Sequence, residues 1–221
     1  SVPEGLPMSV TLSLALSMNR MLKTNNLVRK MHACETMGAT TVICTDKTGT
    51  LTQNKMTVED YYIDGKRITA DAIDVADPAQ RCLLDYSILC NDSTNENGVE
   101  IGDPTETALI NLGSRYGIEA AGVRKLYPRE GELPFDSDRK MMSTLHRIDD
   151  ENRMIVKGAV DQLLELTDRI WTKDGVREIT EADKEKIRRQ NQEFSMEGLR
   201  VLAFTYREIP EKHVLTTEDE N

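Results

Sequence analysis

Asp46 begins the run Asp46-Lys-Thr-Gly-Thr50, in which a carboxylate is followed by a cation, hydroxyl groups and a glycine. Such a carboxylate can attack a phosphoryl group and form an acyl phosphate, which splits a difficult transfer into two easier steps. Lys47 places positive charge beside the phosphate, Thr48 supplies a hydroxyl group, and Gly49 lets the backbone approach closely. Asp46, Lys47 and Thr48 are therefore the candidate catalytic residues. Asp46 and Thr48 are also candidate oxygen ligands for a Mg²⁺ ion that neutralises the phosphate.

The residue two positions after Asp46 argues against a simple phosphatase. Dehalogenase-like phosphatases carry a second Asp there as a general acid and base, whereas Thr48 cannot transfer a proton at neutral pH. An aspartyl phosphate at Asp46 is therefore expected to hydrolyse slowly, which suits a protein that stores the intermediate. For the tetrapeptide taken alone, an N-capping Asp in a strand-to-helix turn is the structural alternative.

The elements before and after Asp46 must position it. The β-branched run over residues 40–45 predicts a buried strand that ends at Asp46, where catalytic groups of α/β folds commonly lie. Upstream, residues 8–33 are expected to form one helix, with prolines only near its start. Downstream, residues 56–63 are predicted to form a strand that ends at the turn Asp64–Gly65.

The rest of the chain alternates hairpin strands with helices. We expect helices over residues 78–90, 104–116, 160–166 and 180–197, and strands over 141–148, 153–157 and 200–206. Asp149–Asp150–Glu151 is the turn between two of these strands, and Thr180 with Asp183 forms a capping box. The predicted fold class is therefore α+β, a twisted antiparallel sheet flanked by helices.

The composition excludes some classes of protein. The net charge of −10 over 221 residues argues against nucleic-acid binding, which needs a basic face. Residues 1–57 carry a net charge of +3 and the remainder −13, which indicates two segments with different surroundings. The four cysteines form no CxxC pair and are expected to be reduced thiols.

An uncharged run of 14 residues, Gly5–Met18, lies near the start of the sequence. It is shorter than the roughly 20 apolar residues that cross a bilayer, and basic residues follow it, as on the cytoplasmic side of a membrane helix. We expect a truncated transmembrane helix whose exposed apolar face can cause this chain to self-associate.

Four stretches resemble P-type ATPases. Cys44–Thr52 resembles their phosphorylation motif over its full length, and Pro3-Glu-Gly-Leu-Pro7 resembles the unwound ion-binding part of their fourth membrane helix. The strings over residues 25–29 and 33–38 look most like calcium pumps of the plasma-membrane type, and the resemblance covers nearly the whole chain. It implies four segments: a membrane stub at 1–16, a stalk helix at 17–39, the first strand of an incomplete dehalogenase-like phosphorylation domain within 40–57, and a nucleotide-binding domain at 58–221.

The resemblance also implies an activity. In the intact pump, Asp46 would be phosphorylated by ATP with Mg²⁺, and Glu4 would be a ligand of the transported ion, calcium. The whole protein would be an integral protein of the cell membrane, and this portion would be cytoplasmic. The motifs TGDGxND and DPPR are not found in the chain. This piece is therefore expected to bind ATP weakly and not to phosphorylate itself.

The chain has no GxxxxGK[ST] loop, so ATP is not expected to be held in the Walker manner. The resemblance implies another pocket. In Gly102-Asp-Pro-Thr-Glu106, Glu106 would accept a hydrogen bond from the adenine amino group and Thr105 would line the same wall. Phe135 would stack on adenine, a contact worth about 1–3 kcal/mol.

Five further residues complete the implied pocket. Lys140 would lie on the phosphate side, Lys157 would lie at the floor, and Gly158 would leave room for the ring. Arg200 would bring a guanidinium to the phosphates, and Leu202 would pack against adenine or ribose. Ser137 stands where many calcium pumps have an arginine that reaches the phosphates. Either the phosphate contacts are weaker here, or the lysine and arginine already named suffice.

Each of these residues has a simpler interpretation. Phe135 could belong to the core, the basic residues could form surface ion pairs, and Glu106 could be a first-turn acid favoured by the helix dipole. Two other functions also stay open for the chain: a soluble dehalogenase-superfamily phosphatase or phosphotransferase, and a nucleotide-binding module without chemistry. Thr48 argues against the phosphatase, and the loop beginning at Asp46 argues against the module.

Overall fold

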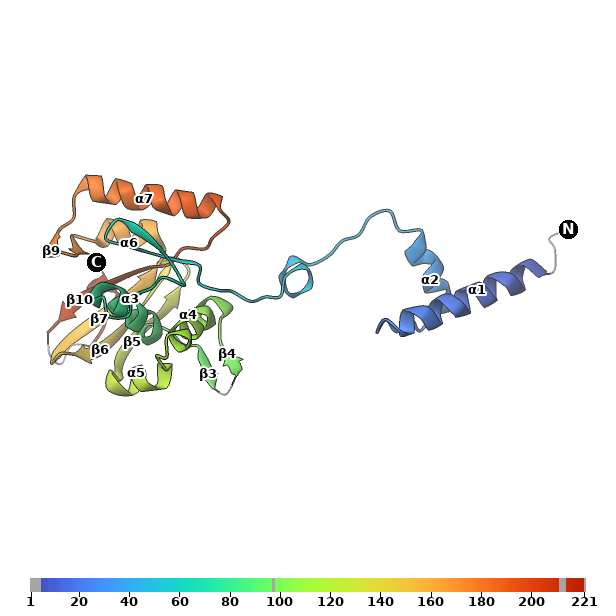
Figure 1. Cartoon of the computed structure of the whole chain (residues 1–221), viewed down its shortest axis with the longest axis horizontal. Coiled ribbons are helices and arrows are strands. Elements are labelled where there is room, and N and C mark those ends of the chain that lie inside the picture. Colours follow the sequence, from blue (N-terminus) through green and yellow to red (C-terminus); the bar gives the residue numbers. More distant parts are fainter. Residues whose placement is uncertain (1–4, 97, 211–213, 221) are drawn as a thin grey trace. The chain divides into compact units, whose positions relative to one another are not determined.

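The computed structural model describes residues 5–96, 98–210 and 214–220, and it divides into two units, residues 1–53 and 54–221. The first unit contains two α-helices and a short π-helix: α1 (Gly5–Leu22), α2 (Met31–Gly38) and η1 (Lys47–Leu51). The second unit contains all the strands found among the described residues (Figure 1). Each unit is described by itself.

The single helix expected over residues 8–33 is wrong, because α1 and α2 are separate helices. Asn25, between them, has a left-handed backbone with φ of 62°. The hydroxyl group of Thr24 donates to the carbonyl of Met21 at 2.8 Å. Polar side chains that bond to the nearby backbone compete with helix formation, which explains the break.

The strand expected over residues 40–45 is also wrong, so Asp46 follows an irregular segment. Within the described ranges no strand pairs with this segment, and Val42 and Ile43 are 74% and 83% exposed. A β-branched run forms a strand only where a neighbour takes its backbone hydrogen bonds and covers its side chains. Without such a neighbour, the local preference of these residues is not realised.

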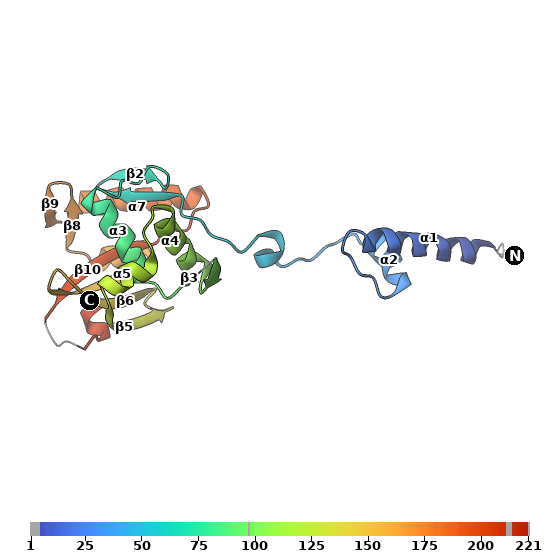
Figure 2. The same ribbon diagram turned by 60° about the horizontal axis from the view of Figure 1, so that its bottom comes forward.

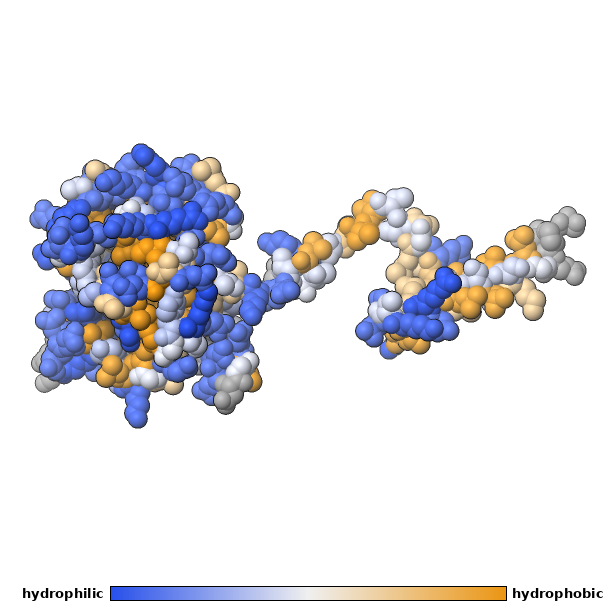
Figure 3. Space-filling model, in the orientation of Figure 1, coloured by the Kyte–Doolittle hydropathy of each residue, from blue (hydrophilic) through white to orange (hydrophobic). Residues whose placement is uncertain are grey.

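Helix α1 has no buried residue, and most of its apolar side chains are exposed (Figure 3). In the part of the chain that the structure describes, no helix combines the length and hydropathy that a bilayer-spanning segment requires. Self-association through this helix stays a prediction.

The second unit is built on a four-stranded antiparallel sheet with the order β10-β7-β6-β5. Its strands are β5 (Arg129–Asp136), β6 (Met141–Ile148), β7 (Glu151–Gly158) and β10 (Ala203–Ile209). Asp149 and Asp150 join β6 to β7 with φ of 53° and 64°, the left-handed pair of a type I′ hairpin. The expected antiparallel sheet with flanking helices is confirmed.

Helices cover both faces of this sheet (Figures 1 and 2). The helices are α3 (Pro78–Leu89), α4 (Pro104–Arg115), α5 (Ala120–Leu126), α6 (Val160–Leu166) and α7 (Glu181–Met196). On one face, Ile88 of α3 and Ile110 of α4 share a core with Ile155 of β7. On the other face, Leu163 of α6 packs with Met154 of β7, and α7 lies against α6.

Capping chemistry explains where the helices begin. Asp77 and Asp103 accept hydrogen bonds from first-turn N–H groups of α3 and α4, each of which has a proline at its start. Thr180 and Asp183 form the predicted capping box of α7. The four helices expected in this unit are confirmed to within one residue at each end, and α5 was not predicted.

Three small hairpins complete the second unit. They are β1 (Asp60–Ile63) with β2 (Lys66–Thr69), β3 (Thr94–Glu96) with β4 (Val99–Ile101), and β8 (Arg169–Thr172) with β9 (Gly175–Glu178). The 3₁₀ turn η2 (Thr217–Glu220) follows β10. The strands expected over residues 56–63 and 200–206 begin later than predicted, at Asp60 and Ala203.

Strand β5 was not predicted, because its sequence does not read as a strand. It contains Gly131 and Pro134 among charged residues, and its pairing with β6 shifts register at two places. Proline and bulges are confined to edge strands, which is where β5 lies. This irregular edge strand leads directly into the candidate site.

Candidate functional site

The residues expected to bind a nucleotide lie at one end of the four-stranded sheet or on the helix beside it. Antiparallel pairing places the end of β5, the start of β6, the end of β7 and the start of β10 together, because Met141 and Ala203 both pair with Gly158. Phe135 lies on β5, and Lys157 and Gly158 lie on β7. Lys140 directly precedes β6, and Arg200 and Leu202 lie in the segment that leads into β10. Thr105 and Glu106 occupy the first turn of α4.

Lys157 and Glu106 form a buried ion pair at this end of the sheet. Lys157 is 6% exposed, and its ammonium group contacts one carboxylate oxygen of Glu106. The second oxygen accepts a hydrogen bond from the backbone N–H of Asp92 at 3.1 Å, and the Ser93 hydroxyl lies at 3.4 Å. A buried charge without a partner is costly, so each member of the pair depends on the other.

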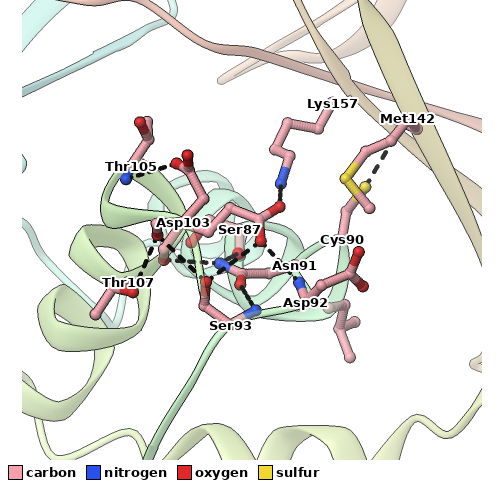
Figure 4. A network of polar contacts seen from close by, with 12 residues as sticks. Ser87, Cys90, Asn91, Asp92, Ser93, Asp103, Thr105, Thr107, Met142 and Lys157 are labelled. Atoms are coloured by element: carbon pink, nitrogen blue, oxygen red, sulfur yellow. Dashed lines mark hydrogen bonds and ion pairs between the residues drawn. The ribbon is translucent and has the colours of Figure 1, made fainter. Parts of the chain in front are cut away.

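The loop after α3 holds Glu106 in place through Asn91, whose surroundings Figure 4 shows. The side-chain amide of Asn91 donates to the carbonyls of Glu106 at 2.9 Å and Ser87 at 3.1 Å, and its oxygen accepts from the N–H of Ser93 at 2.8 Å. In Figure 4, Lys157 points toward this loop. Asn91 is 1% exposed, so every polar group it offers is used for positioning and none is left to solvent.

Two arginines fix that loop from its other side. Arg124 donates to the carbonyls of Asn91 and Ser93, both at 2.9 Å. Arg129 donates to the carbonyl of Asn91 at 2.9 Å and to the carboxylate of Asp92 at 2.7 Å. Burial lowers the pKa of Arg124 from its ordinary value.

Neither Asn91 nor the two arginines were singled out from the sequence. The sequence signal that could have identified this loop is the polar run Asn91-Asp-Ser93 just after a helix, where free carbonyl groups need hydrogen-bond donors.

The start of α4 brings Thr105 and Arg200 together. Arg200 donates to the hydroxyl oxygen of Thr105 at 3.0 Å, and Asp103 accepts from the N–H of Thr105 at 2.8 Å. Burial opposes ionisation of Asp103, but hydrogen bonds from Thr105 and Glu106 and the charge of Arg200 outweigh it and lower its pKa. Asp103 was not predicted as part of the site, although an Asp directly before a helix-starting proline is a recognisable cap signal.

Gly158 has a packing role that the sequence did not reveal. A methyl group at this position would lie 2.7 Å from the carbonyl oxygen of Lys140 and 2.8 Å from the Cβ of Met141. Glycine therefore lets the β5–β6 turn approach β7, and the Lys140 carbonyl accepts from the N–H of Ala159 at 3.1 Å. This close approach is one reason for a glycine at position 158. The reason predicted from the sequence, that glycine leaves room for the adenine ring, is separate.

Phe135 and Lys140 are exposed members of the set, as Arg200 also is. The Phe135 ring is 63% exposed, which overturns the alternative that this residue belongs to the core. Lys140 is exposed and has a left-handed backbone with φ of 56°. An exposed aromatic ring offers a stacking surface for a flat ligand.

A groove of about 1000 Å³ runs along the β10 edge of the sheet. Among the predicted residues only Thr105, Arg200 and Leu202 line it, whereas the Lys157–Glu106 pair and Phe135 do not. Its lining comes from several elements, among them β10, α3, α6, α7 and the β1–β2 hairpin. We therefore place the candidate site at the end of the sheet, where the buried ion pair and exposed ring lie, with Thr105 and Arg200 at the junction with the groove.

The proposed phosphorylation residues belong to the first unit. Asp46 is exposed and precedes η1, which begins at Lys47, while Glu4 and the side chain of Thr48 lie outside the described residues. The described residues contain no group of three or more His, Cys, Asp or Glu that could hold a metal ion. Asp46 offers one carboxylate, and Mg²⁺ usually binds through one or two carboxylates together with substrate phosphates. Its donor chemistry therefore fits a Mg²⁺ ion that arrives with a nucleotide.

Comparison with known families defines the class of the protein. Residues 79–221 match the family described as P-type ATPase, cytoplasmic domain N. The match covers more than half of the chain and includes all eight residues of the candidate site. The chain therefore belongs to the P-type ATPase family.

Individual relatives are similar over nearly the whole chain. Calcium-transporting ATPase 1 of Bacillus cereus is 43% identical over 214 residues, which cover 97% of this chain and 24% of that protein. A calcium-transporting ATPase of Listeria monocytogenes is 43% identical over 100% of this chain and 26% of its own length. Calcium-transporting ATPase 1 of Lactococcus lactis is 41% identical over 100% of this chain and 25% of its own length. The chain thus spans about a quarter of the length of these relatives.

Proposed function

We propose that this chain carries the ATP-binding domain of a P-type ATPase that transports calcium. The observation that carries the proposal is the site at the end of the sheet, where the buried Lys157–Glu106 pair adjoins a surface with an exposed Phe135. Calcium as the transported ion is supported by the names of the relatives.

In this proposal the adenine base and the phosphates of the nucleotide are bound by different residues. Adenine stacks on the exposed ring of Phe135, and its amino group donates to Glu106, whose carboxylate has lone pairs beyond those used by Lys157 and Asp92. Lys140 and Arg200 supply positive charge for the phosphates. Thr105 and Leu202 complete the wall, and Gly158 keeps the β5–β6 turn close to β7.

Asp46 is the proposed phosphoryl acceptor in the whole protein. A carboxylate oxygen of Asp46 forms a bond to the γ-phosphorus of ATP as the bond to the bridging oxygen breaks, which leaves an acyl phosphate and ADP. Lys47 balances charge at the transferring group. Mg²⁺, held by Asp46 and Thr48, would neutralise the phosphates. Thr48 provides no general base, so water attacks the intermediate slowly.

The remaining assignments follow from the same family resemblance. Residues 40–57 would begin a dehalogenase-like phosphorylation domain, residues 58–221 would form the nucleotide-binding domain, and residues 17–39 the stalk. Residues 1–16 would belong to a membrane helix in which Glu4 is a calcium ligand, with the rest of the chain on the cytoplasmic side of the cell membrane.

Titration of the chain with ATP, followed by calorimetry, tests the binding site. Phe135→Ala should weaken binding by roughly 5- to 150-fold, the equivalent of the stacking energy of one base. Lys173→Ala, on the β8–β9 turn, is a matched surface control, and Asp46→Asn should bind ATP as the wild type does. Saturable ATP binding that is equally strong in Phe135→Ala would contradict the assigned site.

Calcium transport needs the whole protein. We expect calcium-dependent ATP hydrolysis by the full-length protein in vesicles, with a phosphorylated intermediate that Asp46→Asn abolishes. Hydrolysis that proceeds in Asp46→Asn at the wild-type rate would exclude Asp46 as the acceptor. ATP hydrolysis that calcium does not stimulate would point to another ion.

A further inference from the structure

A buried carboxylate in the turn η2 contacts the loop that carries Phe135 and Lys140. Glu220 is 8% exposed, although the two residues before it are also acidic and Glu218 is exposed. Carboxylates are rarely buried without partners, because removal from water must be offset by charge and hydrogen bonds. The burial of Glu220 therefore calls for an explanation in its contacts.

Both oxygens of Glu220 have partners on the sheet. One accepts a hydrogen bond from the hydroxyl group of Ser143, a fully buried residue of β6. The other forms an ion pair with the guanidinium of Arg139, which lies in the β5–β6 turn. A second guanidinium nitrogen of Arg139 donates to the carbonyl of Pro134 at 2.9 Å. Arg139 thus connects the buried carboxylate to the other end of the turn.

Two exposed residues of the proposed site flank the β5–β6 turn: Phe135 near the end of β5 and Lys140 just before β6. Phe135 directly follows Pro134, and Lys140 directly follows Arg139, so each is next to an anchored residue. Within the turn, the Asp136 carboxylate accepts from the N–H of Arg139 at 2.9 Å, and the Asp136 carbonyl accepts from the N–H of Lys140 at 2.7 Å.

Lys140 needs such an anchor more than most residues. Its left-handed backbone, with φ of 56°, is uncommon outside glycine and is maintained only where surrounding contacts require it. The Glu220–Arg139 pair supplies a contact one residue away, from a segment distant in sequence. Local hydrogen bonds shape the turn, and this pair attaches it to the body of the unit.

We propose that Glu220 is a positioning residue for nucleotide binding, which holds Arg139 and thereby keeps Phe135 and Lys140 in the arrangement that binds ATP. This inference rests on the proposed function of the site. Glu220 does not touch the nucleotide. Its effect is on the fraction of molecules whose turn is competent to bind, and the apparent dissociation constant is inversely proportional to that fraction.

The test compares ATP affinity in variants that loosen the turn with a variant that does not. Glu220→Gln and Arg139→Met each remove the ion pair, and a competent fraction of about one tenth would raise the apparent dissociation constant about tenfold. The double variant should bind as weakly as either single variant and no more so, because both changes break the same contact. Arg139→Met also covers the case in which Glu220→Gln fails to fold.

Ser143→Ala is the matched control. It removes the other partner of Glu220 from the buried side of the sheet but leaves the turn anchored, so ATP affinity should stay within about twofold of the wild type. Amide hydrogen exchange over residues 134–140 supplies a second measurement: exchange should become faster in Glu220→Gln and stay unchanged in Ser143→Ala. A residue that only stabilises the fold would not produce this selective change.

Wild-type affinity in Glu220→Gln, or an equal loss in Ser143→Ala, would overturn the positioning role. Additive effects of Glu220→Gln and Arg139→Met would do the same. These results differ from failure of the proposed function, in which the wild-type chain itself does not bind ATP. In that event the binding role of Glu220 is refuted together with the site.

Discussion

Replacing Glu106 by glutamine tests how strongly the buried ion pair couples stability to the site. The change preserves the shape of the side chain and removes its charge. The Lys157 side chain is only 7% exposed, and the Glu106 side chain is 15% exposed. The ammonium group would therefore stay buried beside a neutral amide.

The expected loss follows from leaving one charge of the pair without its partner. Removing one partner of a buried ion pair costs about 3–5 kcal/mol. Because the amide oxygen of glutamine still accepts a hydrogen bond from Lys157, we expect a loss of about 3 kcal/mol in the free energy of unfolding.

Urea denaturation followed by Trp171 fluorescence measures this loss. Trp171 is the only tryptophan of the chain and lies on β8, so its signal reports the second unit alone. The double variant Glu106→Gln with Lys157→Met places neutral groups of similar size at both positions, which is often nearly neutral for stability. It should therefore be more stable than Glu106→Gln alone, while ATP binding stays impaired.

Two results would refute this reasoning. One is a loss below about 1 kcal/mol in Glu106→Gln, which would mean that water or another group already screens the ammonium. The other is a double variant less stable than both single variants, which would mean that the two residues contribute independently. Lys173→Met, an exposed change on the β8–β9 turn, controls for the general effect of replacing a lysine by methionine.

Three further predictions concern stability. Gly158→Ala should cost about 1–3 kcal/mol by calorimetry, because its methyl group would meet the carbonyl oxygen of Lys140, whereas Gly122→Ala in α5 has open space and should stabilise by about 0.5–1 kcal/mol. Burial raises the pKa of the Cys90 thiol from 9.0 to about 11. The thiol of the unfolded chain ionises at lower pH than that of the folded chain, so its contribution to stability is full below pH 9 and falls by about 2–3 kcal/mol as the pH rises to 11. Cys90→Ala should lack this loss, and a flat pH profile of stability in the wild type would disprove it. Thr180→Ala should cost about 1 kcal/mol in urea and Thr180→Ser little, since serine also caps, and equal losses would count against the cap.

The helices of the second unit could be predicted from the sequence because their signals are local. Asp103 before Pro104 marks the start of α4, and Thr180 with Asp183 marks the start of α7. The segment over residues 40–45 has an equally clear local signal and yet forms no strand, since a strand depends on a partner as a helix does not. Strand β5 is the converse case. Its sequence has a low local preference for strand structure, and it forms a strand because it pairs with β6.

The site could be predicted only in part. The resemblance placed Glu106 and Lys157 in one pocket, but their ion pair joins residues far apart in sequence, and no spacing rule reveals it. The Asn91 loop and the arginines that hold it were missed for the same reason. Their role comes from carbonyl groups that the tertiary structure brings within reach, and the sequence does not display such groups.

The Lys157–Glu106 pair also has a consequence for how this domain can diverge. A single replacement at either position leaves a buried charge without its partner. The loss is a large share of the 5–15 kcal/mol that is typical for the free energy of unfolding of a domain. Replacing both residues with neutral ones avoids that penalty but removes the carboxylate that we propose binds adenine. The two positions are therefore epistatic. Descendants that lose nucleotide binding should show both residues exchanged together, and intermediates with one exchanged should be rare.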